Sequence, residues 1–248
     1  MYTLFAAITG LVLTTLIGLT VIIAALLRVP DRGGVYDWAP RTWARALLAV
    51  SRVKVEVHDP EGRLRTGEPR IFVANHLSWY DVLALAKVLP RYKFIGKAEL
   101  GKIPLFGRAA QAAAMILIDR DNRKAAFESY RAAADKIRAG NSVIVYPEGT
   151  RGRDYALRPF KKGPFVLAVA AGVPIVPTVI YGAIEVLPRG SFRVRPGTIH
   201  IYPLEPVPTA GLSYDDRDAL MREVHGRMAA ALRERWGVVS QPARAVGE

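Results

Sequence analysis

Apolar positions along the chain gather in short runs separated by helical patterns, and they predict a regular succession of strands and helices. Six apolar runs are expected to form strands, at residues 53–58, 70–74, 114–118, 142–146, 174–182 and 198–207. Helical patterns lie between or after them, at residues 79–88, 121–140, 165–172 and 213–236. This alternation predicts one α/β domain whose central sheet is largely parallel and flanked by helices.

The chain begins with a long apolar segment, and its first charged side chain is Arg28. As a helix, Leu4–Leu27 would extend about 36 Å, against a hydrocarbon core of about 30 Å. The threonines of this segment form no broad hydrophilic stripe, which favours a membrane helix over a long core helix. It also lacks the basic start and the A-x-A site of a cleaved signal peptide. We therefore expect a membrane anchor that either spans the bilayer or dips into one leaflet.

The next segment predicts a second helix with interfacial character. Residues 36–52 carry tryptophans and arginines beside leucine and valine, a composition typical of a helix that lies on lipid headgroups. Basic residues follow the apolar segment rather than precede it, and they include Arg28, Arg32, Arg41 and Arg45. The positive-inside rule then predicts that the rest of the chain lies on the cytoplasmic face of the cell membrane. The expected organisation is an anchor over residues 1–52, a domain over residues 53–236 and a flexible tail over residues 237–248.

Composition and charge narrow the classes of partner and chemistry. The formal net charge of +13 favours an anionic partner, such as nucleic acid, an acidic membrane face or a phosphorylated substrate. The aromatic residues are not interleaved with the basic ones as base-stacking platforms would require, which argues against nucleic acid. The absence of cysteine excludes disulfides, thiolate metal sites and a cysteine nucleophile. The four histidines are scattered without H-x-x-x-H spacing, so no metal site is expected.

Polar residues follow three of the predicted strands. His76 comes just after the strand at 70–74, Asp119 and Arg120 follow the strand at 114–118, and the sequence PEGTR (147–151) follows the strand at 142–146. In open α/β sheets, ligands bind beyond the carboxyl ends of the strands. The pattern therefore predicts a single site with a base and two guanidinium groups.

The stretch FVANHLSWYD (72–81) allows two interpretations. Ser78 and Asp81 fit a capping box, in which Asp81 would only favour the positive end of a helix by about 0.3–1 kcal/mol. Alternatively, the chain folds His76 back over the first turn, so that Asp81 fixes its tautomer and stabilises the cation formed when it accepts a proton. No G-x-S-x-G elbow occurs, so the second interpretation favours direct deprotonation of a substrate hydroxyl without a covalent enzyme intermediate.

Two arginines indicate what the other end of that substrate carries. Arg120 and Arg151 can each grip a phosphate with a planar fork of donors. Gly149 would let the neighbouring backbone approach a ligand closely. An alcohol with a phosphate group is the substrate that this combination predicts.

Four ordered sequence blocks resemble the glycerolipid acyltransferases, particularly the 1-acylglycerol-3-phosphate acyltransferases. They are NHLSWYD, MILIDR, YPEGTR and VPIVPTVIYG, and the resemblance covers residues 71–182. The stretches GKAELGKIPLFG and PFKKG are also similar to recurrent family sequences. Two positions depart from the family pattern: an alanine-rich stretch replaces the usual glycine before MILIDR, and Gly152 follows Arg151 where serine is common.

The resemblance implies a glycerol-3-phosphate acyltransferase-like fold and a role for individual residues. His76 would be the general base on the acceptor hydroxyl, with Asp81 as its partner. Lys97 would contact the phosphate, and Pro177 would shape the acyl or acceptor cavity. The glycerol-phosphate site would comprise Arg120, Glu148, Gly149, Thr150 and Arg151.

The resemblance also implies a reaction in phospholipid biosynthesis. A fatty acyl group would pass from acyl-CoA or acyl-carrier protein to the free hydroxyl of lysophosphatidic acid, giving phosphatidic acid at the membrane. The mechanism demands no metal or bound cofactor, and the expected partners are membrane lipids, lysophosphatidic acid and the thioester donor, not nucleic acid. Two alternatives stay open: acylation of glycerol-3-phosphate or of another lysophospholipid or lyso-aminolipid, and a basic membrane-binding protein without catalysis.

Overall fold

A computed structural model of the chain describes residues 2–30, 34–113, 115–118, 123–241 and 243. In chain order the elements are α1 (Tyr2–Leu26), α2 (Val35–Val50), β1 (Val53–Val57), β2 (Ile71–Ala74), α3 (Trp79–Val88), β3 (Tyr92–Lys97), η1 (Ala98–Lys102), α4 (Phe106–Ala112), β4 (Ile116–Ile118), α5 (Arg123–Arg138), β5 (Ser142–Val145), α6 (Gly163–Ala171), β6 (Ile175–Tyr181), α7 (Ala183–Val186), β7 (Gly197–Pro203), η2 (Tyr214–Asp216) and α8 (Arg217–Trp236).

These strands form a single sheet in the order β1-β7-β6-β2-β5-β3-β4. Neighbouring strands are parallel except for the antiparallel pair β6 and β7. The prediction of an α/β fold with a largely parallel sheet is therefore confirmed. In particular, β2 lies between β5 and β6, so the segments that follow β2 and β5 leave the sheet at the same edge.

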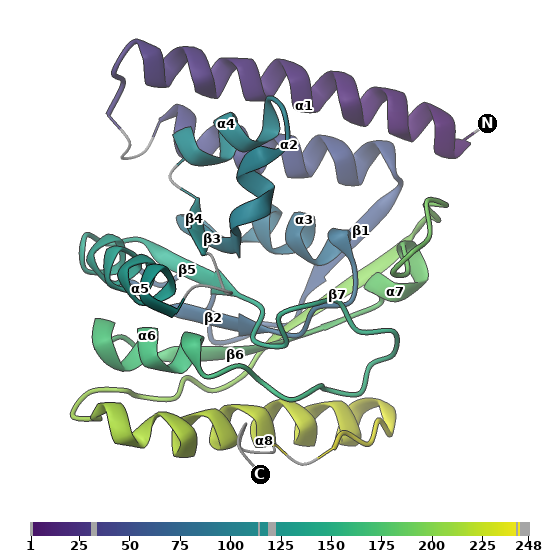
Figure 1. Ribbon diagram of the computed structural model, residues 1–248. Coiled ribbons are helices and arrows are strands. Elements are labelled where there is room, and N and C mark those ends of the chain that lie inside the picture. The colour runs from purple at the N-terminus through teal and green to yellow at the C-terminus, as the bar shows by residue number, and fades with distance from the viewer. Residues whose placement is uncertain (1, 31–33, 114, 119–122, 242, 244–248) are drawn as a thin grey trace.

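Helices cover both faces of the sheet, which places it in the middle of three layers (Figure 1). Successive residues of β2 point to opposite faces of the sheet. Ile71 and Val73 join the core between the sheet and α5, α6 and α8. Phe72 and Ala74 join the core between the sheet and α2 and α3. Both sets are fully or almost fully buried. Burial on both faces explains why the strand reads as an uninterrupted apolar run.

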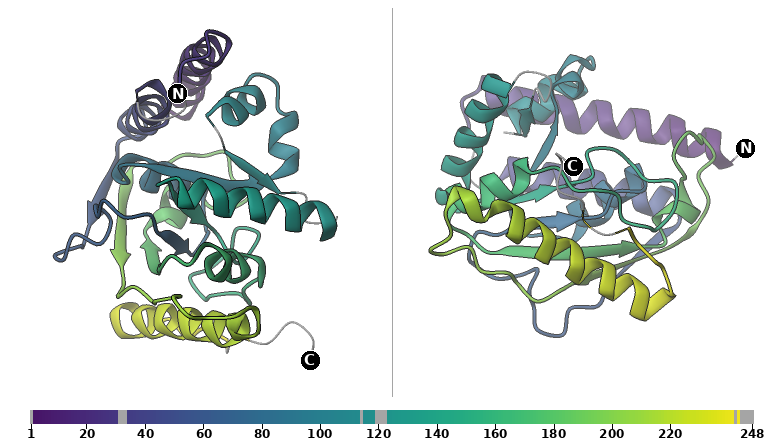
Figure 2. Two further views of the ribbon diagram at one scale, coloured as in Figure 1. Left: turned by 90° about the vertical axis from the view of Figure 1, so that its left-hand side faces the viewer. Right: turned by 60° about the horizontal axis from the view of Figure 1, so that its bottom comes forward.

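Helix α1 packs against the domain instead of projecting from it. It lies along α2 and also contacts α4, and the end-on view in Figure 2 shows these three helices above the sheet. Gly10 and Gly18 permit the close approach, because an added Cβ would lie 3.3 Å from Leu47 and 3.5 Å from Ala109. The outward face of α1 exposes large apolar side chains, namely Leu4, Phe5, Ile8, Leu11, Val12, Leu16, Leu19, Ile23 and Leu26.

Within the described residues, α1 is the one helix long and apolar enough to cross a membrane. Its candidate span, Leu4–Leu26, has a mean hydropathy of 2.3. A row of exposed apolar side chains on a helix of this length and composition is typical of a surface that associates with a membrane or a partner.

The hydrophobic pattern missed β3 and helix α4. Lys93 interrupts the apolar run in β3, and a lysine is seldom fully buried unless it is paired. Here Lys93 is 4% exposed, and its Nζ donates to the carbonyl oxygen of Ala113 at 3.1 Å. The last helix also begins later than predicted, because residues 214–216 form a short 3-10 turn ahead of α8.

A pair of glycines tests the tight junction between β6 and β7. Gly182 (φ +93°) and Gly190 (φ +84°) both have positive φ, but an added Cβ would lie 2.1 Å from Thr198 O at Gly182 and meets nothing within 4 Å at Gly190. Gly190→Ala should therefore cost only the backbone strain, about 1 kcal/mol of unfolding free energy. Gly182→Ala should cost at least about 2 kcal/mol more, because the backbone of β7 must move. Denaturant unfolding of both variants in mild detergent measures the difference, and equal losses would contradict the close contact.

Candidate active site

The ring of His76 lies against the first turn of α3, where it meets a buried carboxylate. His76 Nδ1 is 3.0 Å from Asp81 Oδ2, and Asp81 is fully buried. The same oxygen accepts backbone N–H bonds from Leu77 at 2.6 Å and Ser78 at 2.7 Å. Because Oδ2 acts as an acceptor toward the backbone, we assign the ring contact as a bond donated by Nδ1–H. This tautomer leaves Nε2 of His76 as the nitrogen that can accept a proton.

The two interpretations of the FVANHLSWYD stretch therefore describe one arrangement. Ser78 is the N-cap of α3, Asp81 is at the third helical position, and a capping box is present. The carboxylate that caps the helix also contacts His76. Ser78 Oγ accepts from Tyr80 N at 3.2 Å and donates to Leu187 O at 2.7 Å, so its hydroxyl is engaged in structural hydrogen bonds.

The backbone of His76 is held from the segment that follows β5. Its N–H donates to Glu148 Oε1 at 2.9 Å, and its carbonyl oxygen accepts from Gly152 N at 2.7 Å. The preceding residue, Asn75, forms a pair of hydrogen bonds with the backbone of Ile180 in β6, at 2.9 and 2.7 Å. These bonds fix the position from which the imidazole projects.

Glu148 is a buried carboxylate whose contacts among the described residues are with backbone. Besides His76 N, it accepts from Arg158 N at 3.3 Å. Burial raises the pKa of Glu148 to about 7, although both backbone hydrogen bonds oppose the rise. The resemblance assigned Glu148 to the glycerol-phosphate site; in the structure its carboxylate accepts from the backbone N–H groups of His76 and Arg158.

Tyr146 is a neighbour of His76 that sequence reasoning missed. Its ring stacks on His76 with 4.1 Å between centroids and 19° between planes. Burial raises the pKa of Tyr146 well above its ordinary value, and its buried hydroxyl has no hydrogen-bond partner among the described residues. In the sequence, Tyr146 is only the last residue of an apolar strand pattern, and nothing in that pattern indicates that its ring lies against His76.

Arg151 lies on the same side of the site as His76. Its guanidinium carbon is 5.2 Å from the centre of the Trp79 ring, and its carbonyl oxygen accepts from Arg189 Nη1 at 2.9 Å. Burial, with the neighbouring positive charge of Arg189, lowers the pKa of Arg151. The preceding Gly149 has a φ of +75°, which favours glycine because other residues rarely adopt it.

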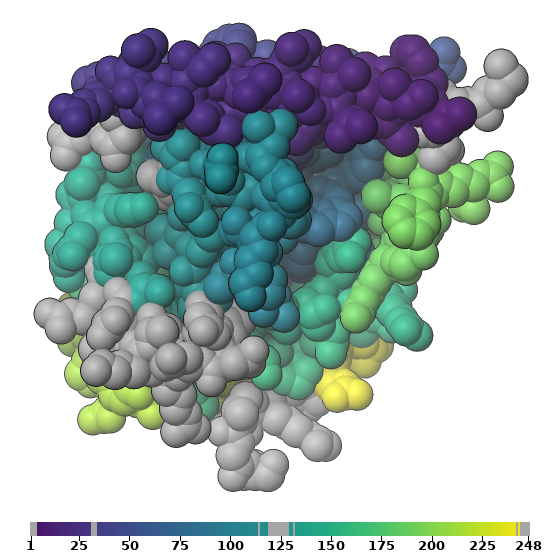
Figure 3. Space-filling view, turned by 45° about the horizontal axis from the view of Figure 1, so that its top comes forward, coloured from purple at the N-terminus to yellow at the C-terminus, as the bar shows by residue number. Residues whose placement is uncertain are grey.

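A cavity of about 810 Å³ connects these residues to the helices above the sheet. His76, Lys97, Gly149, Thr150 and Arg151 line it together with Tyr146 and Trp79. Most of the remaining wall is apolar and comes from α1, α2, β3 and α4, including Ala6, Gly10, Ile17, Trp43, Phe94 and Phe106. Figure 3 shows the hollow between α1 in purple, the teal segment with η1 and α4, and the green segment that leads to β7.

Among the described residues, Pro177 is a predicted site residue that does not join this group. Pro177 lies in β6, where side chains alternate between the two faces of the sheet. It is therefore on the same face as Ile175 and Val179, which both pack on the side of α8. The cavity is on the opposite face, so the position of Pro177 argues against a direct role in shaping it. Arg120 lies outside the described residues, which leaves the second predicted guanidinium group without a position.

Comparisons with known proteins identify the family. Residues 54–181 match a family model described as Acyltransferase. The chain is 36% identical over 167 residues to a 1-acyl-sn-glycerol-3-phosphate acyltransferase of Limnanthes douglasii, covering 66% of this chain and 59% of the relative. It is 35% identical over 178 residues to 1-acyl-sn-glycerol-3-phosphate acyltransferase beta of Homo sapiens, covering 71% and 64%.

One solved structure is similar over nearly the whole chain. It is the 1-acyl-sn-glycerophosphate (LPA) acyltransferase PlsC from Thermotoga maritima, which is 26% identical with a TM-score of 0.79, covering 97% of each chain. The chain spans between 45% and 66% of the length of the curated relatives.

Glu148 should make stability depend on pH. Since its pKa is raised from 4.5 to about 7, the folded chain holds more protons than the unfolded chain between these values. The contribution is fully present below pH 4.5 and is lost as the pH rises through about 7, amounting to about 3 kcal/mol at most. As the pH rises through this range, the unfolding free energy of the wild type should therefore fall relative to that of Glu148→Gln, whose side chain does not titrate.

A control separates this effect from the mere loss of a negative charge. Glu68→Gln removes an exposed carboxylate of the same type. Wild-type and Glu148→Gln curves that run parallel from pH 4.5 to 7 would show that Glu148 does not titrate in this window.

Proposed function

The chain belongs to the Acyltransferase family, and from this premise we propose that it transfers a fatty acyl group from a thioester donor to the free hydroxyl of lysophosphatidic acid. The donor would be acyl-CoA or acyl-carrier protein, and the product would be phosphatidic acid. The names of its relatives support this acceptor. The observation that carries the proposal is the His76–Asp81 pair beside Arg151 at an apolar cavity.

In the proposed mechanism, Nε2 of His76 removes the proton from the acceptor hydroxyl. The resulting oxygen attacks the thioester carbonyl carbon, and the tetrahedral intermediate collapses with breakage of the C–S bond. The leaving thiolate takes the proton from the imidazolium, which returns His76 to its starting state. Asp81 stabilises the transient cation through Nδ1–H.

A direct transfer is favoured over a covalent acyl-enzyme. The chain has no cysteine, and the nearest serine, Ser78, uses its hydroxyl in two structural hydrogen bonds. The nucleophile would therefore be the acceptor itself.

Arg151 would hold the phosphate of the acceptor, assisted by Thr150 and the backbone at Gly149. Its guanidinium lines the cavity with His76, and its stacking on Trp79 limits the orientations it can take. Arg120 and Lys97 would complete the positive surroundings. Glu148 would act indirectly, by bracing the backbone of His76.

The apolar part of the cavity would receive the acyl chain. Its walls include residues of α1 and α2, whose outward sides expose apolar side chains such as Leu11, Leu16 and Trp38. We propose that residues 1–52 form the membrane anchor and residues 53–236 the acyltransferase domain. Because α1 packs along α2 and α4, it would lie within one leaflet, and the charge of +13 would favour the anionic cytoplasmic face of the cell membrane.

Removing the imidazole should abolish transfer while the fold persists. With purified protein and labelled palmitoyl-CoA, lysophosphatidic acid should be the best acceptor in a panel that includes glycerol-3-phosphate and other lysophospholipids. His76→Ala should lower kcat by at least about 10³-fold, because the general base is lost. Tyr214→Ala, which removes an exposed aromatic ring that does not line the cavity, is the control.

The same assay separates the alternatives. Turnover with glycerol-3-phosphate but not with lysophosphatidic acid would replace the proposed acceptor. No turnover with any acceptor would favour a basic membrane-binding protein without catalysis. Equal turnover by His76→Ala and wild type would instead show that His76 is not the general base.

Filling the cavity should change the preference for donor length. Ala109 in α4 lines the cavity close to Gly18 in α1. Ala109→Phe should lower kcat/KM at least about tenfold for long-chain acyl-CoA donors and leave short-chain donors almost unaffected, because only the long chain needs that space. Ala132→Phe, on the exposed side of α5, is the control. An equal loss for all chain lengths would mean that this part of the cavity does not hold the acyl chain.

A further inference from the structure

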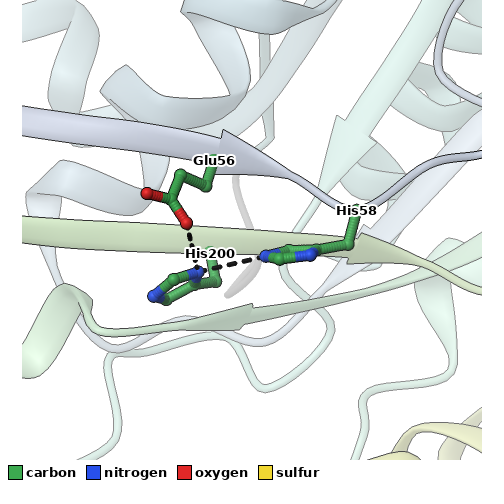
Figure 4. A group of neighbouring side chains, drawn as sticks. All are labelled: Glu56, His58 and His200. Atoms are coloured by element: carbon green, nitrogen blue, oxygen red, sulfur yellow. Dashed lines mark hydrogen bonds and ion pairs between the residues drawn. The ribbon is translucent and has the colours of Figure 1, made fainter.

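Strand pairing at the edge of the sheet gathers three side chains that suit a metal ion. β1 and β7 pair in parallel with Glu56 opposite His200. His58 comes two residues after Glu56, so both side chains project from the same face, and the N–H of His58 donates to Ile201 O at 2.9 Å. The backbone register thus brings together one carboxylate and two imidazoles (Figure 4).

The distances between their ligand atoms match those around a tetrahedral ion. His58 Nε2 is 3.1 Å from His200 Nδ1, which is 3.4 Å from Glu56 Oε2, and all three atoms lie within 4.8 Å of one another. Zn²⁺ with ligand bonds of about 2.0–2.2 Å places neighbouring ligand atoms about 3.3–3.5 Å apart. The Glu56–His200 separation lies within this range and the His58–His200 separation is slightly shorter, and rotation of the exposed Glu56 side chain can shorten the third.

Proton counting also favours a cation between these atoms. His200 Nδ1 faces both His58 Nε2 and Glu56 Oε2 but carries at most one proton (Figure 4). If Nδ1 carries the proton, it can donate to only one of the two; if His58 Nε2–H donates to Nδ1, no hydrogen lies between Nδ1 and the ionised Glu56 carboxylate. In either tautomer one of the two contacts lacks a hydrogen. A metal ion would instead accept a lone pair from each of the three atoms.

The site is partly rigid before any ion binds. The ring of His58 stacks on Tyr202 with 4.1 Å between centroids and 4° between planes. Tyr202 is in turn packed edge-on against Trp236 of α8 and lies under the guanidinium of Arg235 at 4.5 Å. Fixing one ligand in advance reduces the entropy lost on binding.

We propose that Glu56, His58 and His200 bind a divalent transition-metal ion, for which Zn²⁺ is the best match, with a water molecule in the fourth position. Two imidazoles and a carboxylate are ligands that Zn²⁺ accepts readily. The histidine spacing in the sequence predicted no metal site, because His58 and His200 are 142 residues apart and only the β1–β7 register joins them.

The ion would fasten an edge strand rather than take part in chemistry. β1 follows α2 directly, so a clamp between β1 and β7 would tie the N-terminal helices to the sheet. The three ligands do not line the cavity, and they project from the face opposite to Ile199 and Ile201, which pack with α3. The metal site therefore stands independently of the proposed transfer reaction.

Zinc titration of the full-length, tag-free protein in detergent tests the site. After treatment with a chelator, calorimetry with ZnCl₂ should show one saturable site per chain, and the thermal midpoint should rise with Zn²⁺ and return with EDTA. His58→Ala and His200→Ala should each weaken binding by at least about 100-fold, and Glu56→Gln by about tenfold. Glu68→Gln, at an exposed position outside the cluster, should bind as the wild type does.

Two results would overturn the assignment. One is the absence of saturable binding to the wild-type chain. The other is binding that survives in all three ligand variants, which would locate the ion elsewhere. Circular dichroism of the metal-free variants checks that they are folded, and the conservative Glu56→Gln keeps the test valid where a histidine variant is unstable.

Discussion

The arrangement of the active site depends on one buried carboxylate oxygen. Asp81 Oδ2 accepts from two backbone N–H groups at the start of α3 and contacts the imidazole of His76. A buried charge is costly unless it is hydrogen-bonded, and these donors offset part of that cost. The same bonds end the loop after β2, start the helix and orient the imidazole of His76. Folding and orientation of the imidazole are thus two consequences of a single interaction, which is why the sequence supported both interpretations.

A second carboxylate acts on the other end of the same residue. Asp81 holds the ring of His76, whereas Glu148 holds its backbone N–H. Both carboxylates are almost or fully buried, and the charge of Asp81 contributes to the raised pKa of Glu148. The site therefore brings two acidic groups close together in a chain with a large positive net charge. Among the described residues, their hydrogen bonds are with backbone N–H groups and the His76 ring rather than with arginine or lysine side chains. Arg151 is therefore available to the cavity.

The sequence revealed those parts of the site that follow from local pattern. Adjacent parallel strands end at a common edge, so His76 and Arg151 could be brought together from the strand pattern alone. The roles of Asn75, Tyr146 and Glu148 depend on contacts across 70 to 105 residues, such as the bonds between Asn75 and Ile180, and local pattern does not encode them. β3 was not predicted because it contains a lysine, Lys93, whose burial depends on a hydrogen bond to the carbonyl oxygen of Ala113 that forms only in the folded chain. The Glu56–His58–His200 group likewise depends on strand register.

The helices with exposed apolar faces also form walls of the cavity. Residues of α1 and α2 line it on their inner sides, while α1 exposes leucines and isoleucines on its outer side. Under the proposed function, a lipid substrate would then pass from the bilayer into the cavity across a layer only one helix thick. The contact between α1 and the domain would have two tasks, because it both closes the acyl cavity and holds the domain at the membrane. Gly10 and Gly18 serve both tasks by letting α1 approach α2 and α4 closely. A helix that crossed the bilayer away from the domain would leave the cavity open on that side, so the packing of α1 favours an anchor that lies in the plane of one leaflet.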